Sequence, residues 1–191
     1  MAAEPALTVR ERLIKTGIQE LSIHGIQDFS VRRVASACGV SCAAPYKHFE
    51  DKNRFIAGII EYVINLWESN IPEVIAKYPN DLRTQLTEIS VRYVHFLVEN
   101  SHFRSIIMLK DPGFDQEYSD LRHRLSNTSR TLVQQYCESV NMPQEVMDYK
   151  LYIVRSLIYG AALMFDNGEM KYNAENMEFV RRAVSREFKL P

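Results

Sequence analysis

The sequence of 191 residues has little of what marks secreted, membrane or disulfide-bonded proteins. Its three cysteines are an odd number without the paired spacing of a disulfide framework, which favours a reducing compartment. No stretch reads as a signal peptide. The longest apolar run, residues 152–165, contains Arg155 and is too short to cross a bilayer. We therefore expect a cytoplasmic protein without a membrane partner.

An excess of charge of one sign is also missing, because 23 Lys and Arg stand against 24 Asp and Glu. The distribution is less even: residues 1–56 hold eight Lys and Arg against six Asp and Glu, so the N-terminal part is slightly basic. Strand-like alternation and internal repeats are absent as well. With 46% hydrophobic residues the chain can bury a core, and we expect an all-α fold.

Residues 30–50, SVRRVASACGVSCAAPYKHFE, have the pattern of two short helices joined by a tight turn. Apolar residues recur with helical spacing over residues 31–38, and Ser30 can cap that helix. Gly39 suits a left-handed residue after the helix end. A second helix is expected over residues 42–47. Helix, glycine-containing turn and helix is the DNA-reading helix-turn-helix pattern.

The second helix carries aromatic and basic groups that can donate hydrogen bonds to DNA phosphates. The expected phosphate contacts are Tyr46, Lys47, His48 and Lys52. Three residues at the tip of the helix can touch base edges. They are Ser41, Cys42 and Ala43. Ser30 and Arg32 complete the predicted interface, with two alternatives left open: Ser41 chiefly as a cap, and Arg32 as a solvent-facing residue. Pro45 is expected to be tolerated within the first turn of this helix.

The motif Val-Ala-x-x-x-Gly-Val-Ser, followed by Ala-Pro-Tyr-Lys-His-Phe, Asp51-Lys52 and an apolar helix, resembles that of the TetR-type repressors. The resemblance implies a three-helix DNA-binding module over residues 1–50. It also implies a C-terminal helical domain over residues 51–191 that binds a small effector and dimerises. Two copies would then place reading helices in successive major grooves of a pseudo-palindromic, double-stranded operator.

Caps and breakers place several further helices. Thr8 and Glu11 have the spacing of a capping box, which predicts the start of the first helix. A long helix from Asp51 is expected to run for about 20 residues, or about 30 Å, toward Pro72. A shorter one is expected over Phe103–Leu109.

The last two expected helices predict a dimer interface. Residues 146–165 are apolar on nearly every side, and a helix of that kind must be covered on nearly every side. With the helix expected over residues 173–188, they would form a four-helix interface between two copies. The expected interface residues are Leu157, Gly160, Ala161, Met164, Val180 and Val184.

The middle of the chain is rich in aromatic residues, each of which can also be plain core. Together they predict an apolar pocket with a few polar tips, because buried tyrosines need hydrogen-bond partners. The predicted ligand-binding residues are Tyr62, Trp67, Tyr93, His95, Phe96, Phe103, Met108, Tyr118, Tyr149 and Tyr152. An apolar or amphipathic effector is expected, and a planar or cationic one is left open.

Two other classes of function stay open at this point. The chain could be an enzyme that uses His95, His102 and Asp115, or a helical adaptor whose helix-turn-helix binds protein. No cofactor is predicted. Cys38, Cys42 and His48 have the spacing of no common zinc site. A metal site that combines His95 and His102 with the downstream His123 and Asp111 or Asp115 is a further open alternative, although the expected binding residues include no metal ligand.

Overall fold

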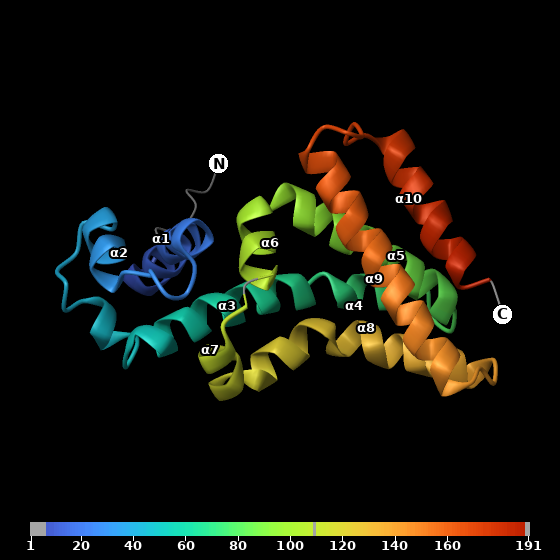
Figure 1. Cartoon of the computed structure of the whole chain (residues 1–191), viewed down its shortest axis with the longest axis horizontal. Helices are drawn as coiled ribbons and strands as arrows, with labels where there is room; N and C mark the ends of the chain where they lie inside the picture. Colours follow the sequence, from blue (N-terminus) through green and yellow to red (C-terminus); the bar gives the residue numbers. More distant parts are fainter. Residues whose placement is uncertain (1–6, 109, 190–191) are drawn as a thin grey trace. The chain divides into compact units, whose positions relative to one another are not determined.

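The computed structural model describes residues 7–108 and 110–189. Five side chains inside these ranges are also left undescribed: Arg122, Leu125, Ser126, Thr128 and Ser129. Throughout the described ranges every regular element is a helix, so the all-α class expected from the sequence is confirmed (Figure 1). Within the same ranges no helix has both the length and the apolar character needed to span a membrane.

The chain folds into two compact units. The first unit comprises Met1–Asn65 and Ser101–Arg122, and the second comprises Leu66–Asn100 and His123–Pro191. Two long helices, α3 and α8, therefore contribute residues to both units. The helices are α1 (Val9–His24), α2 (Val31–Ala37), the 3-10 turn η1 (Pro45–Lys47), α3 (Lys52–Glu68), α4 (Ile71–Lys77), α5 (Leu82–Glu99), α6 (Ser101–Met108), α7 (Pro112–Glu117), α8 (Ser119–Ser139), α9 (Gln144–Asp166) and α10 (Ala174–Glu187).

Helix α1 begins with the capping box predicted from the sequence. The backbone N–H of Glu11 donates to Thr8 Oγ1 at 3.2 Å, and the backbone N–H of Thr8 donates to Glu11 Oε2 at 2.8 Å. Gly25 ends the helix with φ 70°, a left-handed conformation that favours glycine. The buried residues of this helix recur with helical spacing: Leu13, Ile14, Gly17, Ile18 and Leu21.

The second helix of the motif, expected over residues 42–47, is not an α-helix. The chain turns at residues 42–44 and forms only the single 3-10 turn η1. The reason is Pro45, which has no N–H to bond the carbonyl of Ser41. That carbonyl accepts instead from the backbone N–H of Ala44 at 2.9 Å, three residues on. The α-helix expected over residues 42–47 was therefore wrong, although Pro45 does lie in a first turn, that of η1.

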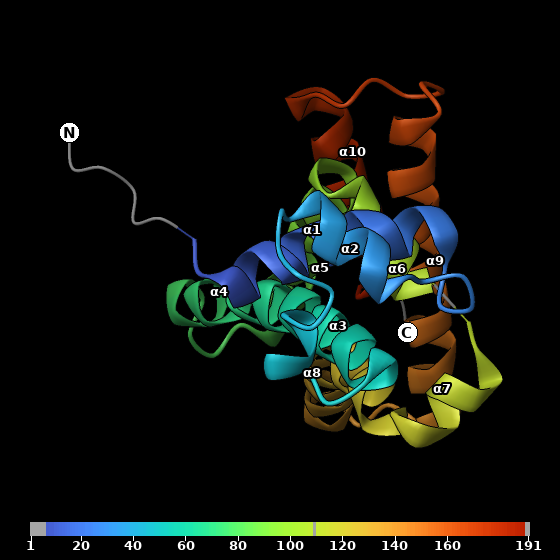
Figure 2. The ribbon, with the colours of Figure 1, turned by 90° about the vertical axis from the view of Figure 1, so that its left-hand side faces the viewer.

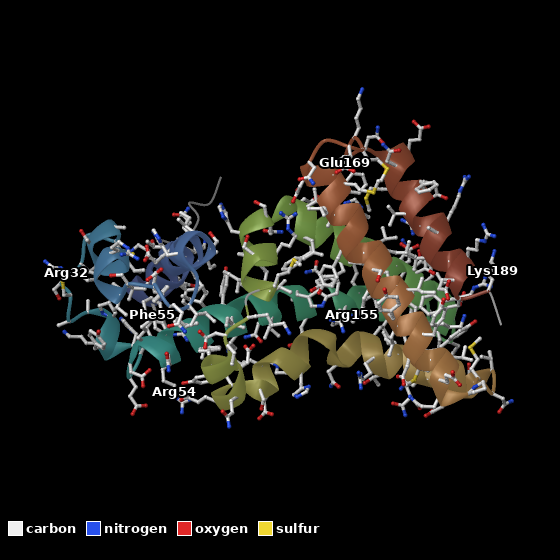
Figure 3. All side chains as sticks on the ribbon, viewed as in Figure 1. Arg32, Arg54, Phe55, Arg155, Glu169 and Lys189 are labelled. Atoms are coloured by element: carbon white, nitrogen blue, oxygen red, sulfur yellow. The ribbon has the colours of Figure 1, made fainter. Side chains whose placement is uncertain are left out.

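The core of the first unit is built on three phenylalanines. The Phe49 ring stacks on Phe55 with centroids 4.2 Å apart, and Phe29 meets Phe55 edge-on at 5.4 Å. All three side chains are buried. Figure 3 shows Phe55 inside the unit and Arg32 at its outer edge. Because Phe49 lies two residues after the end of η1, this stack anchors the end of the segment of residues 41–48.

Helix α6 also belongs to the first unit, where it packs against α1 (Figures 1 and 2). The hydroxyl of Ser22 on α1 lies 3.1 Å from His102 Nδ1 on α6. The side chain of Gln27, in the loop after α1, donates to the carboxylate of Asp111, which also caps α7 by accepting from the backbone N–H of Phe114 at 2.9 Å. Leu109, at the expected end of the helix that begins near Phe103, lies outside the described residues.

In the second unit, α5 packs against both α9 and α10. Side-chain caps start two of these helices: Asp81 accepts from the backbone N–H of Thr84 at 3.0 Å, and Asn173 accepts from that of Asn176 at 2.9 Å. The helices expected over residues 146–165 and 173–188 correspond to α9 and α10. Two short helices, α4 and α7, were not anticipated, because Pro72 and Pro112 act as first-turn residues as well as breakers.

Candidate nucleic-acid interface and ligand-binding region

A carboxylate on α1 holds the N-terminus of α2 in place. Glu20 Oε1 accepts from the backbone N–H of Ser30 at 3.0 Å and from Arg33 Nε at 2.8 Å, and Arg33 Nη2 donates to the same oxygen. Burial raises the pKa of Glu20, but these hydrogen bonds outweigh it and the pKa lies below its ordinary value. Ser30 Oγ caps the helix by accepting from the backbone N–H of Arg33 at 3.3 Å, as predicted.

The turn after α2 is set by Gly39 and by the hydrogen bond that follows it. Gly39 has φ 66°, and the backbone N–H of Val40 donates to the carbonyl of Ala35 at 3.1 Å. The left-handed residue and the returning hydrogen bond end α2 and turn the chain toward η1. Residues 41–48 therefore leave α2 on a fixed path.

Most of the predicted DNA contacts lie on the surface of this segment. Six of them are exposed in the first unit: Arg32, Ser41, Cys42, Ala43, Lys47 and His48. Tyr46 is 55% exposed although its neighbour Pro45 is buried. Within the described part of the chain neither Arg32 nor Lys47 makes an ion pair. Two cationic groups and a phenol are therefore available to a polyanion.

Two predicted contacts also have internal partners. Ser30 is the cap described above, and Lys52 is half-buried with its Nζ donating to the carbonyl of Gln27 at 2.8 Å. Lysine has three donors, so this bond leaves two for a phosphate. Arg33, the neighbour of Arg32, pairs with Glu20. The Glu20–Arg33 pair was missed because nothing local couples residues 13 apart on different helices.

In the second unit three of the predicted ligand-binding aromatics lie together. Trp67 is 4.4 Å from Tyr93 and 5.6 Å from Phe96, measured between ring centroids. Tyr93 in turn meets Tyr159 of α9 at 6.4 Å. Burial, then the neighbouring Tyr159, raises the pKa of Tyr93 well above its ordinary value, so its hydroxyl stays protonated. Tyr159 was not predicted, although it follows Tyr152 by seven residues on one helix face.

The other predicted ligand-binding residues are dispersed. In the first unit Tyr62 and Phe103 are half-buried, Met108 is exposed, and Tyr118 is buried against Phe114 with Arg54 over its ring. In the second unit His95 bonds through Nδ1 with the hydroxyl of Tyr172, which donates to Glu99 at 2.8 Å. Tyr149 and Tyr152 are exposed on α9.

A pocket of about 530 Å³ opens between α8 and α9 of the second unit. Of the predicted residues only Tyr152 lines it. The remaining lining residues are Arg130, Asp148, Leu151, Arg155, Ser156 and Tyr159. No local pattern in the sequence joins Arg130 to Arg155, because the two residues are 25 positions apart on different helices.

The predicted dimer residues divide by burial. Ala161, Val180 and Val184 are buried within the single chain, whereas Met164 is exposed and Leu157 and Gly160 are half-buried. A Cβ added to Gly160 would meet nothing within 4 Å, so this glycine borders open space. Four large apolar side chains of α9 are exposed: Tyr149, Tyr152, Leu163 and Met164.

The residues that the enzyme and metal alternatives require do not all lie in one unit. His102 and Asp115 lie in the first unit and His95 in the second, and none of the three lines the pocket. Among the described residues no group of three or more His, Cys, Asp or Glu side chains is arranged to hold a metal ion.

Comparisons with known proteins agree with the motif. Residues 13–59 match the family model of bacterial regulatory proteins of the tetR family. The chain is 24% identical over 181 residues to YerO, an uncharacterized HTH-type transcriptional regulator of Bacillus subtilis, covering 88% of this chain and 60% of that protein. It is 30% identical over 108 residues to the HTH-type transcriptional regulator AcrR of Shigella flexneri, covering 54% and 48%. The matches thus span between about half and three fifths of the length of these two relatives.

Among solved structures, the transcriptional regulator FadR of Bacillus subtilis, in complex with stearoyl-CoA, superposes with a TM-score of 0.72 over 93% of this chain and 96% of that one, at 12% identity. At this identity the likeness concerns the fold. It extends over helices beyond the N-terminal motif, so the motif and the helical architecture agree. The chain belongs to the TetR family of DNA-binding transcriptional regulators.

Proposed function

We propose that this regulator acts as a dimeric repressor that binds a pseudo-palindromic operator through residues 30–52. The observation that carries the proposal is the exposed segment of residues 41–48, which follows a capped helix and ends on the Phe49–Phe55 stack. Exposed donors on a rigid turn can enter a major groove without an ordering cost, whereas donors on a loose loop would lose entropy. A protein that acts on chromosomal DNA would work in the cytoplasm.

Roles within the interface follow from side-chain chemistry. Tyr46, Lys47 and His48, with Lys52, supply phosphate contacts, which add affinity on every sequence. Cys42 and Ala43 are small enough to let the backbone approach base edges and thymine methyl groups. Residues 1–50 would thus read DNA, and residues 51–191 would dimerise and bind an effector.

The experiment is selection of DNA fragments from a random pool, followed by affinity measurements on the selected site. Lys52→Ala should weaken binding about equally on all sequences and flatten the salt dependence, while changes at Cys42 or Ala43 should alter base preference. A change of base preference with Lys52→Ala at unaltered salt dependence would contradict this division of roles. Binding to protein partners that salt does not weaken would favour the adaptor alternative.

Dimerisation is proposed through α9, with α10 behind it. Met164, Leu157 and Gly160 remain accessible in a single chain, together with Tyr149, Tyr152 and Leu163. Ala161, Val180 and Val184 would support this surface from beneath, since they are buried within their own unit. Apolar side chains on a helix face beside a glycine that borders open space suit close helix approach by a second copy.

The effector is proposed to bind in the second unit and to act through α3. The aromatic group of Trp67, Tyr93 and Phe96 adjoins the end of α3, whose first residues belong to the DNA-reading unit. The crystal structure of FadR with stearoyl-CoA supports an amphipathic ligand class for this fold. Release from the operator requires that the effector bind the two conformations with different affinity.

A further inference from the structure

The pocket between α8 and α9 has an unusual balance of charge. Two guanidinium groups, Arg130 and Arg155, line it against a single carboxylate, Asp148. Asp148 accepts a 3.4 Å hydrogen bond from Gln144 Nε2 and forms no ion pair with either arginine among the described residues. A net positive lining attracts an anion.

Neither arginine has a hydrogen-bond or ion-pair partner among the described residues. Both side chains are exposed at the pocket. Other arginines of the same unit are paired: Arg92 with Glu73 at 2.8 Å and Arg124 with Glu68 at 2.7 Å. Figure 3 labels Arg155 on α9. Each guanidinium presents N–H donors in a planar arrangement that suits a carboxylate or a phosphate.

The rest of the lining is apolar or weakly polar. Leu151 contributes an aliphatic wall, and the rings of Tyr152 and Tyr159 add aromatic faces. Ser156 is already engaged, because its hydroxyl donates to the carbonyl of Tyr152 at 2.9 Å. Tyr159 connects the pocket to Tyr93 and, through it, to Trp67. A charged head at the arginines would therefore leave the apolar part of a ligand against aromatic rings.

We propose that this pocket binds the acidic head group, a carboxylate or a phosphate, of an amphipathic small molecule, with Arg130 and Arg155 as its recognition residues. An acidic ligand takes the place of the cationic effector that the aromatic residues alone left open. The reason is that the pocket lining holds two cationic side chains and one anionic side chain. The inference deepens the proposed effector response and depends on it for regulatory meaning. Binding itself is measured without DNA.

The test uses the full chain and four probes with one tail: dodecanoate, dodecyl phosphate, dodecanol and dodecyltrimethylammonium, all below their micelle concentrations. Binding is read by calorimetry and by the fluorescence of Trp67, the only tryptophan. We expect one or both anions to bind at least about tenfold more tightly than the alcohol or the ammonium, since charge-assisted hydrogen bonds to guanidinium are strong. The comparison of dodecanoate with dodecyl phosphate identifies which head group is preferred.

Variants locate the contact. Arg130→Gln and Arg155→Gln should each weaken binding of the preferred anion about tenfold or more, and Arg155→Lys should retain part of it. Arg182→Gln is the matched control, because Arg182 lies on α10, pairs with Glu178 and does not line the pocket. Thermal unfolding of each variant checks that it is folded.

Equal binding of all four probes, tighter binding of the ammonium, or unchanged anion affinity in both pocket variants would overturn the proposal. Operator affinity is measured separately with the same ligand. If the anion binds through Arg155 but leaves operator affinity unchanged, the pocket assignment stands and effector-driven release is wrong. If the uncharged probe lowers operator affinity while neither anion binds more tightly than it, effector-driven release is supported and the assignment of an anionic head group is wrong.

Discussion

Replacing Glu20 by glutamine should loosen the helix-turn-helix without removing a proposed DNA contact. The carboxylate accepts from the Ser30 backbone N–H and from two nitrogens of Arg33, and its side chain is 10% exposed. A hydrogen bond to a charged group contributes about 1.5–3 kcal/mol. The Arg33 side chain is 51% exposed, so solvent screening reduces the contribution of the Glu20–Arg33 pair to the free energy of unfolding to about 0.5–1 kcal/mol. Glutamine keeps one acceptor but loses the charge.

We therefore expect Glu20→Gln to lower the free energy of unfolding by about 1–2 kcal/mol. For a chain of this length the melting temperature should fall by about 2–8 °C. Differential scanning calorimetry measures the loss, and Glu50→Gln, at an exposed position in the same unit, is the control. A double-mutant cycle with Arg33→Gln should give a coupling energy. Unchanged stability, or fully additive effects, would refute the reasoning.

The same carboxylate makes the stability depend on pH. The folded-state pKa of Glu20 lies below its ordinary value. Its contribution is therefore fully present above the unfolded-state pKa and is lost as pH falls through the folded-state pKa. The stability difference between the wild type and Glu20→Gln should shrink on acidification through this acidic range. A difference that grows as pH falls would contradict the assignment.

Two further substitutions test the second unit. Lys150 is buried, with Nζ donating to the carbonyl of Glu187 at 2.8 Å, so Lys150→Ala should cost about 3–5 kcal/mol in chemical denaturation while Lys150→Met costs much less. Equal losses for the two would show that the lost ammonium contacts with Glu187, and not packing, decide the stability. Gly160→Arg should give monomers or aggregates by light scattering, with weakened operator binding, because it places a long, charged side chain in the proposed dimer surface. A well-folded dimer of unchanged mass would place the interface elsewhere.

The parts of the fold that sequence reasoning predicted are those that local chemistry decides. The Thr8–Glu11 capping box, the cap at Ser30 and the turn at Gly39 each depend on a few neighbouring residues, and all three are present. The helix expected over residues 42–47 failed for an equally local reason that was underestimated. A proline without an N–H in so short a segment leaves too few i to i−4 bonds for an α-helix.

What the sequence could not give are pairings between distant residues. Glu20 with Arg33, Gln27 with Asp111, and Lys150 with Glu187 join different elements, and no periodicity predicts such partners. The pocket also depends on residues that are distant in the sequence. Its two arginines come from α8 and α9, and only the packing of those helices brings them to one opening. Aromatic content predicted a pocket but not its charge. DNA contacts were easier to anticipate, because they lie in one continuous segment.

The central claim is that the exposed segment of residues 41–48 binds DNA, and the most direct measurement is the salt dependence of operator affinity with and without Lys47. On a DNA site selected from a random pool, we expect affinity to fall steeply with salt. The slope of log K against log salt should decrease in magnitude by about 1 in Lys47→Gln, since one phosphate contact is lost. Lys171→Gln, at an exposed position in the second unit, should leave the slope unchanged. Equal slopes for the wild type and both variants, or no sequence-selective DNA binding at all, would contradict the account.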